Sequence, residues 1–414
     1  MRDTDLYGRI LGIEAPWRVS GVELRLEDGE VEVSVEHGGA GKLPCPECGL
    51  PSSRYDTRSR RWRHLDTCQY RTILRADVPR VECSQHGVKT IRVPWSESGS
   101  SFTALFEALV IDWLRAANTS AVARLLGLSW DQVDGVMQRA VRRGLARREL
   151  EVPRHLGVDE TSFQKRQEYV TVVADTTRGV VQHVADGRGR GALAGYYAGF
   201  ASEELEGLQS VAMDMWGPYI AATLAAVPQA EDKIAFDKFH VAMHLGSAVD
   251  RVRREENRLL REQGDETLKG TKHLWLYHPD NLPEERAPQF DELVEKALKT
   301  SRAWMLKELA MEMWQCPDRE SAEKIFHAWY SWAIRSRLAP IKRVARMLKR
   351  HLRGVLNAIV ARVTNARIEG LNTMIQWLKR SARGFRNRDR FRNTIYFHLG
   401  GLDLYPSALT HSKS

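Results

Sequence analysis

The sequence has little of what marks a membrane or secreted protein. No apolar run approaches the ~20 residues that span a bilayer, and the mean hydropathy is -0.42. The N-terminal stretch MRDTDLYGRILGIE carries acids and lacks an apolar centre, so we expect no signal peptide. Cysteines number only five in 414 residues. This scarce, odd count favours metal-bound or free thiols in a cytoplasmic protein over a disulfide framework.

Two further shortages narrow the function. The Gly-rich stretch GRGRGALAGYYAGF lacks the Gly-Lys-Ser/Thr of a phosphate loop, so it predicts no nucleotide site. Acids are outnumbered, with 53 Asp and Glu against 62 Lys and Arg, for a net charge of +9. That excess is compatible with a polyanionic partner but does not by itself require one. The length of 414 residues allows two to four domains and a large core.

Two short cysteine and histidine motifs lie in the N-terminal hundred residues. They are Cys45-x-x-Cys48 and Cys83-x-x-His86, with a strand-like run between them. Two such pairs on knuckle turns supply the four ligands of a tetrahedral zinc ribbon. The alternative is two unrelated pairs of buried side chains. Before these motifs, residues 18–37 alternate apolar and polar side chains around an Asp-Gly pair, which predicts a β-hairpin.

Residues 102–146 have the pattern of a helix-turn-helix. Ala123, Gly127 and Val133 supply the small residue, the turn residue and the buried aliphatic residue that this motif needs. Thr119 and Ser129 are expected to cap the two helices. The second helix is expected to expose five polar side chains toward a DNA major groove: Gln132, Gln138, Arg139, Arg142 and Arg143. An ordinary helical hairpin is the alternative.

The pattern changes to strands in residues 154–250. HLGVDE, EYVTVVADTT and GVVQHVADG follow one another with short turns, which predicts an antiparallel meander. LQSVAMD is expected to form a fourth strand, and DKIAFDKFHVAMHL a fifth strand that enters a helix. Three strands followed by helix-separated strands give the α/β order of a ribonuclease H-like core.

In that order the first strand and the end of the fourth each carry a catalytic carboxylate, here Asp159 and Asp214. Neighbouring carboxylates repel one another unless cations neutralise them, and Mg²⁺ prefers such oxygen ligands. An ordinary strand-end Asp is the alternative for each. Asp237 and His240 are secondary candidates, which could assist the site or contact DNA. They could equally be a helix cap and a hydrogen-bonded histidine.

Residues 251–350 are helical by period, which predicts a large all-α insertion in the core. Four tryptophans are expected to form the core of this insertion: Trp304, Trp314, Trp329 and Trp332.

The stretch from Arg335 to Arg392 holds 17 Lys or Arg residues but only two acids, Glu369 and Asp389. An acid close to phosphates weakens binding, so Glu369 is expected to serve a metal. On a helix it shares a polar stripe with Asn372 and Gln376, facing away from the apolar packing seam and therefore available to a cluster at the edge of the sheet. A surface Glu paired with an arginine such as Arg367 is the alternative. Four cations that follow are expected to contact the DNA backbone, unless they form only a solvated basic face: Lys379, Arg380, Arg383 and Arg386.

The motifs LPCPECG…CSQH, HLGVDE, VAMDMWGPY, FDKFH and TNARIEGLN…RSARGFRN, with the helix-turn-helix, resemble the ISL-three family of bacterial insertion-sequence transposases. The resemblance covers nearly the whole chain. It implies a DDE transposase whose triad falls on Asp159, Asp214 and Glu369, with two Mg²⁺ or Mn²⁺ ions. One departure is His86, where the family more often has cysteine; histidine also binds zinc.

The resemblance further implies double-stranded DNA partners, namely terminal inverted repeats and target DNA, and a homodimer or larger synaptic complex in the cytoplasm. An inactive or domesticated DNA-binding repressor and a structure-specific nuclease are the alternatives. The expected division is a β-rich region with the zinc ribbon (1–100), the helix-turn-helix (101–150), the first part of the core (151–250), the helical insertion (251–350), the last core helices (351–400) and a tail (401–414).

Overall fold

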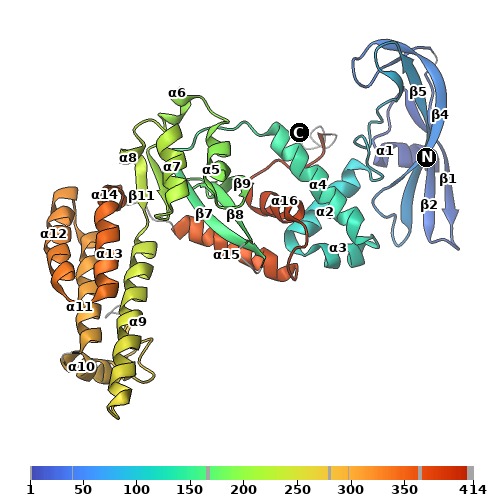
Figure 1. Cartoon of the computed structure of the whole chain (residues 1–414). Helices are drawn as coiled ribbons and strands as arrows, with labels where there is room; N and C mark the ends of the chain where they lie inside the picture. The colour runs from blue at the N-terminus through green and yellow to red at the C-terminus, as the bar shows by residue number, and fades with distance from the viewer. Residues whose placement is uncertain are drawn as a thin grey trace. The chain divides into compact units, whose positions relative to one another are not determined.

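The protein divides into two compact units (Figure 1). A computed structural model describes residues 2–39, 41–164, 168–277, 281–296, 298–361 and 366–407. The first unit is Met1–Glu149 together with Arg392–Ser414, and the second is Leu150–Phe391. The chain therefore leaves the first unit once and returns to it near its end. Residues 408–414 of the expected tail lie outside the described residues.

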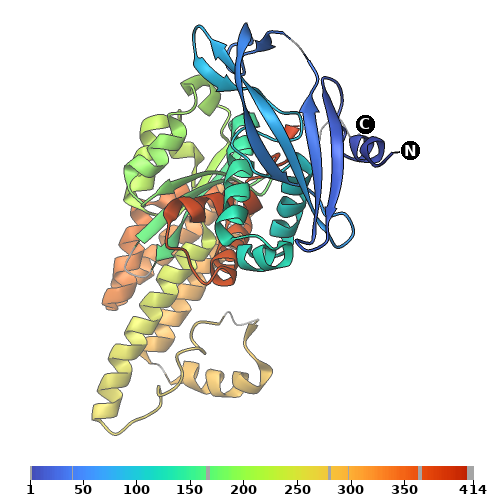
Figure 2. The same ribbon diagram turned by 90° about the vertical axis from the view of Figure 1, so that its right-hand side faces the viewer.

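The first unit begins with a six-stranded sheet of order β1-β2-β5-β4-β3, in which β6 also pairs with β5 (Figure 2). The predicted hairpin is confirmed, because β1 and β2 pair antiparallel and Arg25 lies opposite Glu30. Trp17, Trp62 and Trp95 pack edge to face in its core. The elements are α1 Asp3–Ile10, β1 Trp17–Arg25, β2 Glu30–His37, β3 Leu43–Pro44, β4 Pro51–Arg63, β5 Arg71–Cys83 and β6 Gly87–Thr90.

Three helices follow, α2 Ala104–Ala116, α3 Thr119–Leu126 and α4 Trp130–Arg147. Helix α3 ends at Gly127, whose φ of 62° lies in the left-handed region that glycine adopts at low cost. Ser129 caps α4 in a capping box with Gln132, as predicted. The predicted cap of α3 is wrong by one residue, because the Asn118 side chain, not Thr119, accepts from the amide of Ala121.

The C-terminal segment packs on these helices. A Cβ atom at Gly144 of α4 would overlap the Leu402 side chain, so glycine permits a close approach there. The Arg147 guanidinium contacts the Asp403 carboxylate at 2.7 Å. The Tyr405 hydroxyl donates to Asp112 of α2 at 2.5 Å. Residues 402–405 thus belong to the structure of the helix-turn-helix, which their sequence alone did not indicate.

The second unit contains a five-stranded sheet of order β11-β10-β7-β8-β9. Strands β7, β8 and β9 form the predicted antiparallel meander, and β10 and β11 run parallel to β7. Its elements are β7 His155–Gln164, β8 Glu168–Asp175, β9 Val180–Asp186, α5 Arg190–Tyr197, α6 Ser202–Leu205, β10 Ser210–Met213, α7 Gly217–Ala226, α8 Ala230–Lys233, β11 Ile234–Phe236 and α15 Ala366–Ser381. Helix α16, Arg388–Leu399, begins in this unit and continues into the first.

Side chains of β7 alternate between the two faces of this sheet. Leu156 and Val158 are fully buried in the same apolar core as residues of α5 and α7. Gly157 points the other way, and a Cβ atom there would overlap Ile368 of α15. The absence of a side chain at Gly157 therefore lets α15 lie close against β7 (Figure 1).

A run of helices between β11 and α15, residues 238–360, is called here the helical segment. Its helix α9 lies along α11 and α13 (Figure 1, Figure 2). Within the described residues, none of the protein's helices is both long and apolar enough to cross a membrane. The segment contains α9 Lys238–Glu262, η2 Glu284–Arg286, α10 Ala287–Glu295, α11 Lys299–Met311, η3 Glu312–Gln315, α12 Arg319–Arg335, α13 Ala339–Arg350 and α14 Leu352–Val360.

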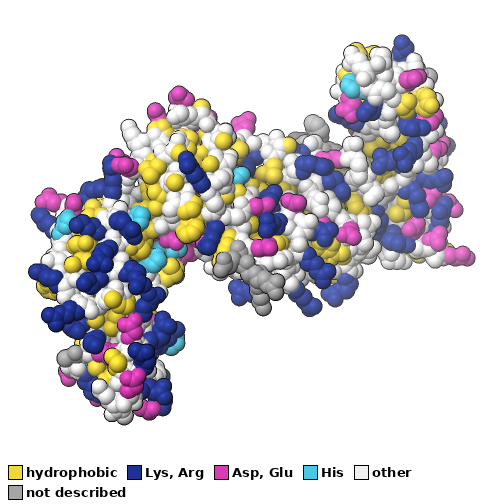
Figure 3. Space-filling model, viewed as in Figure 1, with side chains coloured by type: hydrophobic (Ala, Val, Ile, Leu, Met, Phe, Trp, Pro, Cys, Tyr) yellow, Lys and Arg dark blue, Asp and Glu magenta, His cyan; other side chains and the backbone are white. Residues whose placement is uncertain are grey.

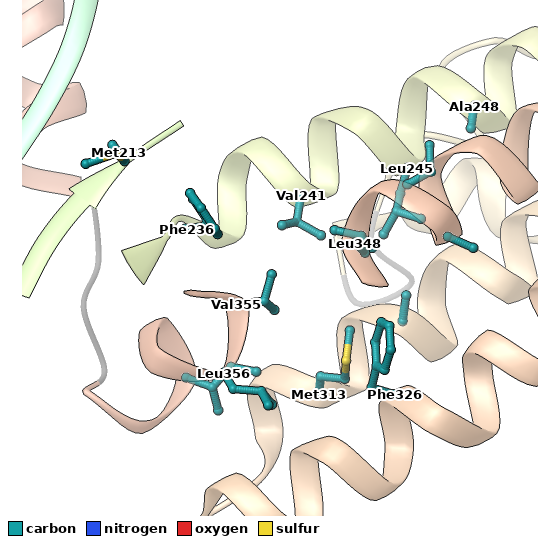
Figure 4. Close-up of a cluster of buried hydrophobic side chains, with 14 of the residues drawn as sticks. Met213, Phe236, Val241, Leu245, Ala248, Met313, Phe326, Leu348, Val355 and Leu356 are labelled. Carbon is teal, nitrogen blue, oxygen red and sulfur yellow. The ribbon is translucent and has the colours of Figure 1, made fainter. Parts of the chain in front are cut away.

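The helical segment shares one apolar core with the end of the sheet. Figure 4 shows Met213 and Phe236 from the strands near Val241 of α9 and Val355 of α14. Of the predicted tryptophan core, Trp329 is fully buried, and its indole NH donates to the carbonyl of Leu306. Trp304 and Trp314 are partly buried against this core. The prediction is wrong for Trp332, which is 58% exposed.

Candidate functional site

Three neighbouring parallel strands of the second unit bring aspartates to one edge of the sheet: β10 and β11 each end one residue before an aspartate, and Asp159 lies within β7. Ala212 of β10 pairs with Gly157 of β7, so Asp159 and Asp214 each lie two residues beyond that pair. Met213 pairs with Phe236 of β11, and Asp237 follows as the N-cap residue of α9. Residues paired across parallel strands lie at the same level, so the register brings these carboxylates to one edge, although β7 itself continues to Gln164.

The electrostatics of this edge favour a cation. Burial raises the pKa of Asp159 to about 6, and the charges of Glu160 and Asp214 also raise it. The backbone amide of Glu160 and the charge of His240 act in the opposite direction. The ring Nδ1 of His240 lies 3.7 Å from Oδ1 of Asp214 and makes no hydrogen bond. The structure thus brings His240 to the Asp159 and Asp214 pair.

Helix α15 lies against β7 through a line of polar contacts. The Asn372 amide donates to Asp159 at 2.6 Å, and the Gln376 amide donates to the Thr161 hydroxyl at 2.6 Å. This part of the polar stripe therefore lies outside the apolar seam and faces the sheet edge, in agreement with the expectation. The apolar stripe is buried, as predicted, through Ile368, Leu371, Ile375 and Leu378.

Glu369 lies on the same helix, one turn before Asn372, and its side chain is exposed. Its predicted alternative partner Arg367 donates instead to the carbonyl oxygens of Thr176 and Thr177. Among the described residues, the only group of three or more possible metal ligands within 4.8 Å of one another is the cysteine and histidine set. Helix α15 therefore brings Glu369 close to this edge of the sheet. Its carboxylate does not, however, form a ligand set with the two aspartates.

An arginine beside this edge was not identified from the sequence. The Arg188 guanidinium lies 4.5 Å from the ring centroid of Tyr169 and 4.8 Å from that of Trp216. It also pairs with Glu160 at 3.2 Å, so Glu160 is held on the face opposite Asp159. In the sequence this arginine lies in the Gly-rich turn that follows a strand, a stretch whose lack of a phosphate-loop motif does not indicate the role of the arginine.

Replacing Asp159 with asparagine is expected to stabilise the metal-free protein at neutral pH. This carboxyl titrates near pH 4 in an unfolded chain and at about 6 in the folded one. Between these values the folded state binds the extra proton, so wild-type stability falls as the pH rises from about 4 to 6. Asp159→Asn removes that loss, with a gain of about 1 to 3 kcal/mol above pH 6 and almost none at pH 4.

The measurement is the difference in Tm between variant and wild type across this pH range, in buffer without Mg²⁺. Asp232→Asn, an exposed aspartate paired with Arg353, is the matched control and should show no such pH dependence. A variant less stable than wild type at pH 7.5 would contradict the burial argument.

The predicted zinc ligands lie together in the first unit. Cys45, Cys48, Cys83 and His86 place their ligand atoms within 4.8 Å of one another. The Sγ atoms of Cys48 and Cys83 are 3.7 Å apart, and Nδ1 of His86 lies 3.7 Å from Sγ of Cys83. Ligand bonds of about 2.0 to 2.3 Å in a tetrahedron give such separations. A backbone amide from Gln85 and the His86 ring lower the pKa of Cys83 to about 6, which favours the thiolate.

The five side chains predicted to face a major groove do not all do so. Arg143 is buried, and its guanidinium pairs with Glu97 and Glu107 and donates to the carbonyl of Leu404. Arg139 is half-buried and pairs with Glu107. Their predicted exposure is wrong, because both neutralise acids inside the unit. Gln132, Gln138 and Arg142 are exposed, although Gln132 takes part in the α4 cap and Gln138 bonds Asp134.

Four cations at the end of α15 and beyond were predicted to contact DNA. Lys379 is half-buried and donates to the carbonyl of Ser162 at 2.7 Å, so its ammonium already has a protein partner. Arg380, Arg383 and Arg386 are exposed. Of the four, these three retain guanidinium groups accessible to a phosphate backbone.

Comparison with known proteins gives three consecutive family matches. A model described as zinc-finger of transposase IS204/IS1001/IS1096/IS1165 matches residues 43–86. A model of the helix-turn-helix domain of transposase family ISL3 matches residues 91–141. A third, described as Transposase, matches residues 156–395, more than half of the chain.

Curated proteins of similar length also match. The transposase for insertion sequence element IS1001 of Bordetella parapertussis is 28% identical over 352 residues. The match covers 84% of this chain and 86% of the length of that transposase. The transposase for insertion sequence element IS1557 of Mycobacterium tuberculosis (strain CDC 1551 / Oshkosh) is 26% identical over 422 residues. The match covers 94% of this chain and 93% of the length of that transposase. Together with the zinc ligands and the helix-turn-helix, these matches show that the chain belongs to the ISL3 family of transposases.

Proposed function

We propose that this transposase binds the terminal inverted repeats of its own insertion sequence and cuts and joins DNA at Asp159, Asp214 and Glu369. The observation that carries the proposal is the pair of aspartates at the same level on neighbouring parallel strands, with Oδ1 of Asp214 facing His240. We propose further that the sheet belongs to a ribonuclease H-like core, which the succession of a three-stranded meander and two helix-separated parallel strands supports. The helical segment would then be an insertion in this core.

The donor set fits a hard divalent cation. Asp159 is a largely buried carboxyl beside a second carboxylate, an arrangement that raises its pKa and that a cation would relieve. Mg²⁺ or Mn²⁺, as two ions held by the three carboxylates, would polarise water and stabilise the attacking and leaving oxygens of an in-line displacement. Glu369 would complete the set by turning from its exposed position on α15 toward the edge.

The remaining residues position these groups. Asn372 holds one oxygen of Asp159, which leaves the carboxylate in a single orientation. In the first step water attacks the phosphodiester at the element's end, and the 3′ oxygen leaves as a hydroxyl. In the second step that hydroxyl attacks a target phosphodiester and displaces another 3′ oxygen, so one bond forms for each that breaks. No covalent bond between protein and DNA is needed.

The modules of the first unit would locate the DNA ends. The helix-turn-helix would read the repeat through Gln132, Gln138 and Arg142, with Arg380, Arg383 and Arg386 on the backbone of flanking or target DNA. Two ends must be joined in concert, so we propose a homodimer or larger synaptic complex. The protein would act in the bacterial cytoplasm, at the nucleoid when bound to DNA.

A joining assay tests this function. Zinc-loaded full-length protein, a labelled duplex ending in the terminal repeat, and plasmid target are incubated with Mg²⁺. Labelled strands are expected to become covalently attached to the plasmid, and a 3′-deoxy end on a pre-cut duplex is expected to block attachment. Cutting without attachment would favour a nuclease. Binding without cutting, in either Mg²⁺ or Mn²⁺, would favour an inactive DNA-binding protein.

A further inference from the structure

Helices α12 and α13 of the helical segment line a groove of about 790 Å³. Five cations of α13 line it: Lys342, Arg343, Arg346, Lys349 and Arg350. The sequence holds no acidic residue between positions 336 and 360. Figure 3 shows Lys and Arg side chains gathered over this part of the second unit.

These cations lack the partners that other arginines of the unit have. On the neighbouring helix α14, Arg353 pairs with both Glu231 and Asp232. Across the part of the chain that the structure describes, no carboxylate pairs with any of the five groove cations. Among the described residues of this unit, no ion pair therefore neutralises the positive charge of the groove.

The orientation of the cationic face is fixed by packing. Ile341 and Ala345 are fully buried and Leu348 nearly so, which turns the opposite side of α13 to the groove. Residues three and four apart on a helix are neighbours, so Arg346 lies beside like charges on both sides. The helix dipole favours cations only at the C-terminal end, which accounts for Lys349 and Arg350 but not for Lys342 in the first turn. An isolated helix gains nothing from this arrangement.

The second wall of the groove comes from α12. The Lys349 ammonium lies 4.8 Å from the ring centroid of Tyr330. This cation–π contact favours a position of the long Lys349 side chain along the groove. From Lys342 to Arg350 the cationic row runs about 12 Å along the helix axis. A DNA strand advances about 3.4 Å per phosphate along its axis. The row therefore matches roughly three consecutive phosphates.

We propose that the α12 and α13 groove binds the phosphodiester backbone of duplex DNA. A repeated polyanion of this spacing is the ligand that an unpaired cationic row of this length would recognise, and the contact would be independent of base sequence. The inference rests on the proposed function, because it assigns to the helical segment the handling of a DNA duplex while the aspartate edge acts on it. The duplex is either the element's terminal DNA or the target.

The test is the salt dependence of DNA binding by the zinc-loaded full-length protein, measured by fluorescence anisotropy without Mg²⁺. One probe carries the terminal repeat and the other is an unrelated duplex. In the groove variant, Arg343, Arg346 and Arg350 are each replaced by glutamine. The matched control replaces three other exposed cations of the same helical segment by glutamine: Arg302, Lys324 and Arg335. Both variants lose the same net charge.

In the groove variant, the plot of log K against log salt is expected to become less steep, with the magnitude of its slope reduced by about 2 to 3. Each lost phosphate contact contributes about 0.9 to that magnitude. The control is expected to change it by less than about 1. Lysine at the same three groove positions should restore the wild-type slope, which separates charge from a folding defect. A reduced slope with both probes indicates a contact with any duplex, whereas a reduction with the terminal probe alone indicates the element's end.

An unchanged slope in the groove variant, or an equal change in the control, overturns the proposal. Its failure is distinct from failure of the proposed function, since wild-type joining activity is measured separately. Joining by wild type combined with an unaltered slope in the groove variant would reject the groove and leave the aspartate edge as proposed.

Discussion

Replacing Asp159 or Asp214 with asparagine is expected to reduce the joining of terminal-repeat DNA to target by about a thousandfold or more. Asparagine keeps the shape of the side chain but removes the charge that would hold a divalent cation. Loss of several kcal/mol of transition-state stabilisation corresponds to this factor. DNA binding should be retained, because the exposed cations that would contact the backbone are left in place. The same loss is expected for Glu369→Gln.

Joined product per minute is the measurement, with anisotropy binding to the same duplex alongside it. Asp232→Asn, in the same unit and on an exposed side chain, should join DNA at the wild-type rate. Since Asp159→Asn should also be more stable than wild type without metal, its inactivity could not be ascribed to unfolding. Wild-type joining by either asparagine variant would show that the edge of β7 and β10 is not the catalytic centre.

Removal of the zinc ligands has the second large expected effect. Serine at Cys45 and Cys83 together should abolish zinc binding and lower the Tm of the first unit by at least about 10 °C. The two knuckles connect different parts of one sheet, since Cys45 follows β3 and Cys83 ends β5. A structural zinc contributes about 10 to 16 kcal/mol of apparent binding free energy, comparable to the stability of a whole domain.

Zinc content by atomic emission, Tm by circular dichroism and limited proteolysis near residues 43–51 and 82–90 give the readouts. Cys68→Ser is the matched control, because Cys68 is exposed and lies outside the ligand set. It should retain one equivalent of zinc and the wild-type Tm. A double variant that still binds zinc stoichiometrically would require other ligands than the four assigned.

The parts of the protein that sequence reasoning predicted correctly are those fixed by short-range chemistry. The Cys45 and Cys83 motifs specify a metal site through spacing alone, and the Ser129 capping box satisfies amides within one turn. The strand succession of the second unit follows from periodicity and turn residues. Each individual motif, cap or strand is specified by residues close together in the chain.

The errors concern side chains whose partners are distant in the chain. Arg143 was predicted to be exposed and to face the DNA major groove, because its partners Glu97 and Leu404 are not its neighbours in sequence. The sequence predicts the polar stripe that contains Asn372 but not the hydrogen bond from Asn372 to Asp159, because this acceptor on β7 lies more than two hundred residues earlier. A helical pattern shows which residues share a face, but it does not show whether a polar face meets solvent or another polar strand.

The return of the chain to the first unit has a consequence for the newly synthesised protein. Helix α4 is complete at Arg147, yet the carbonyl that receives its buried Arg143 belongs to Leu404. Ribosomes add about 5 to 20 residues per second, so roughly 10 to 50 s separate the synthesis of these two parts. Throughout that interval Arg143 lacks one of its acceptors and Arg147 lacks Asp403. The helix-turn-helix reaches its final packing only when the entire second unit has already been made.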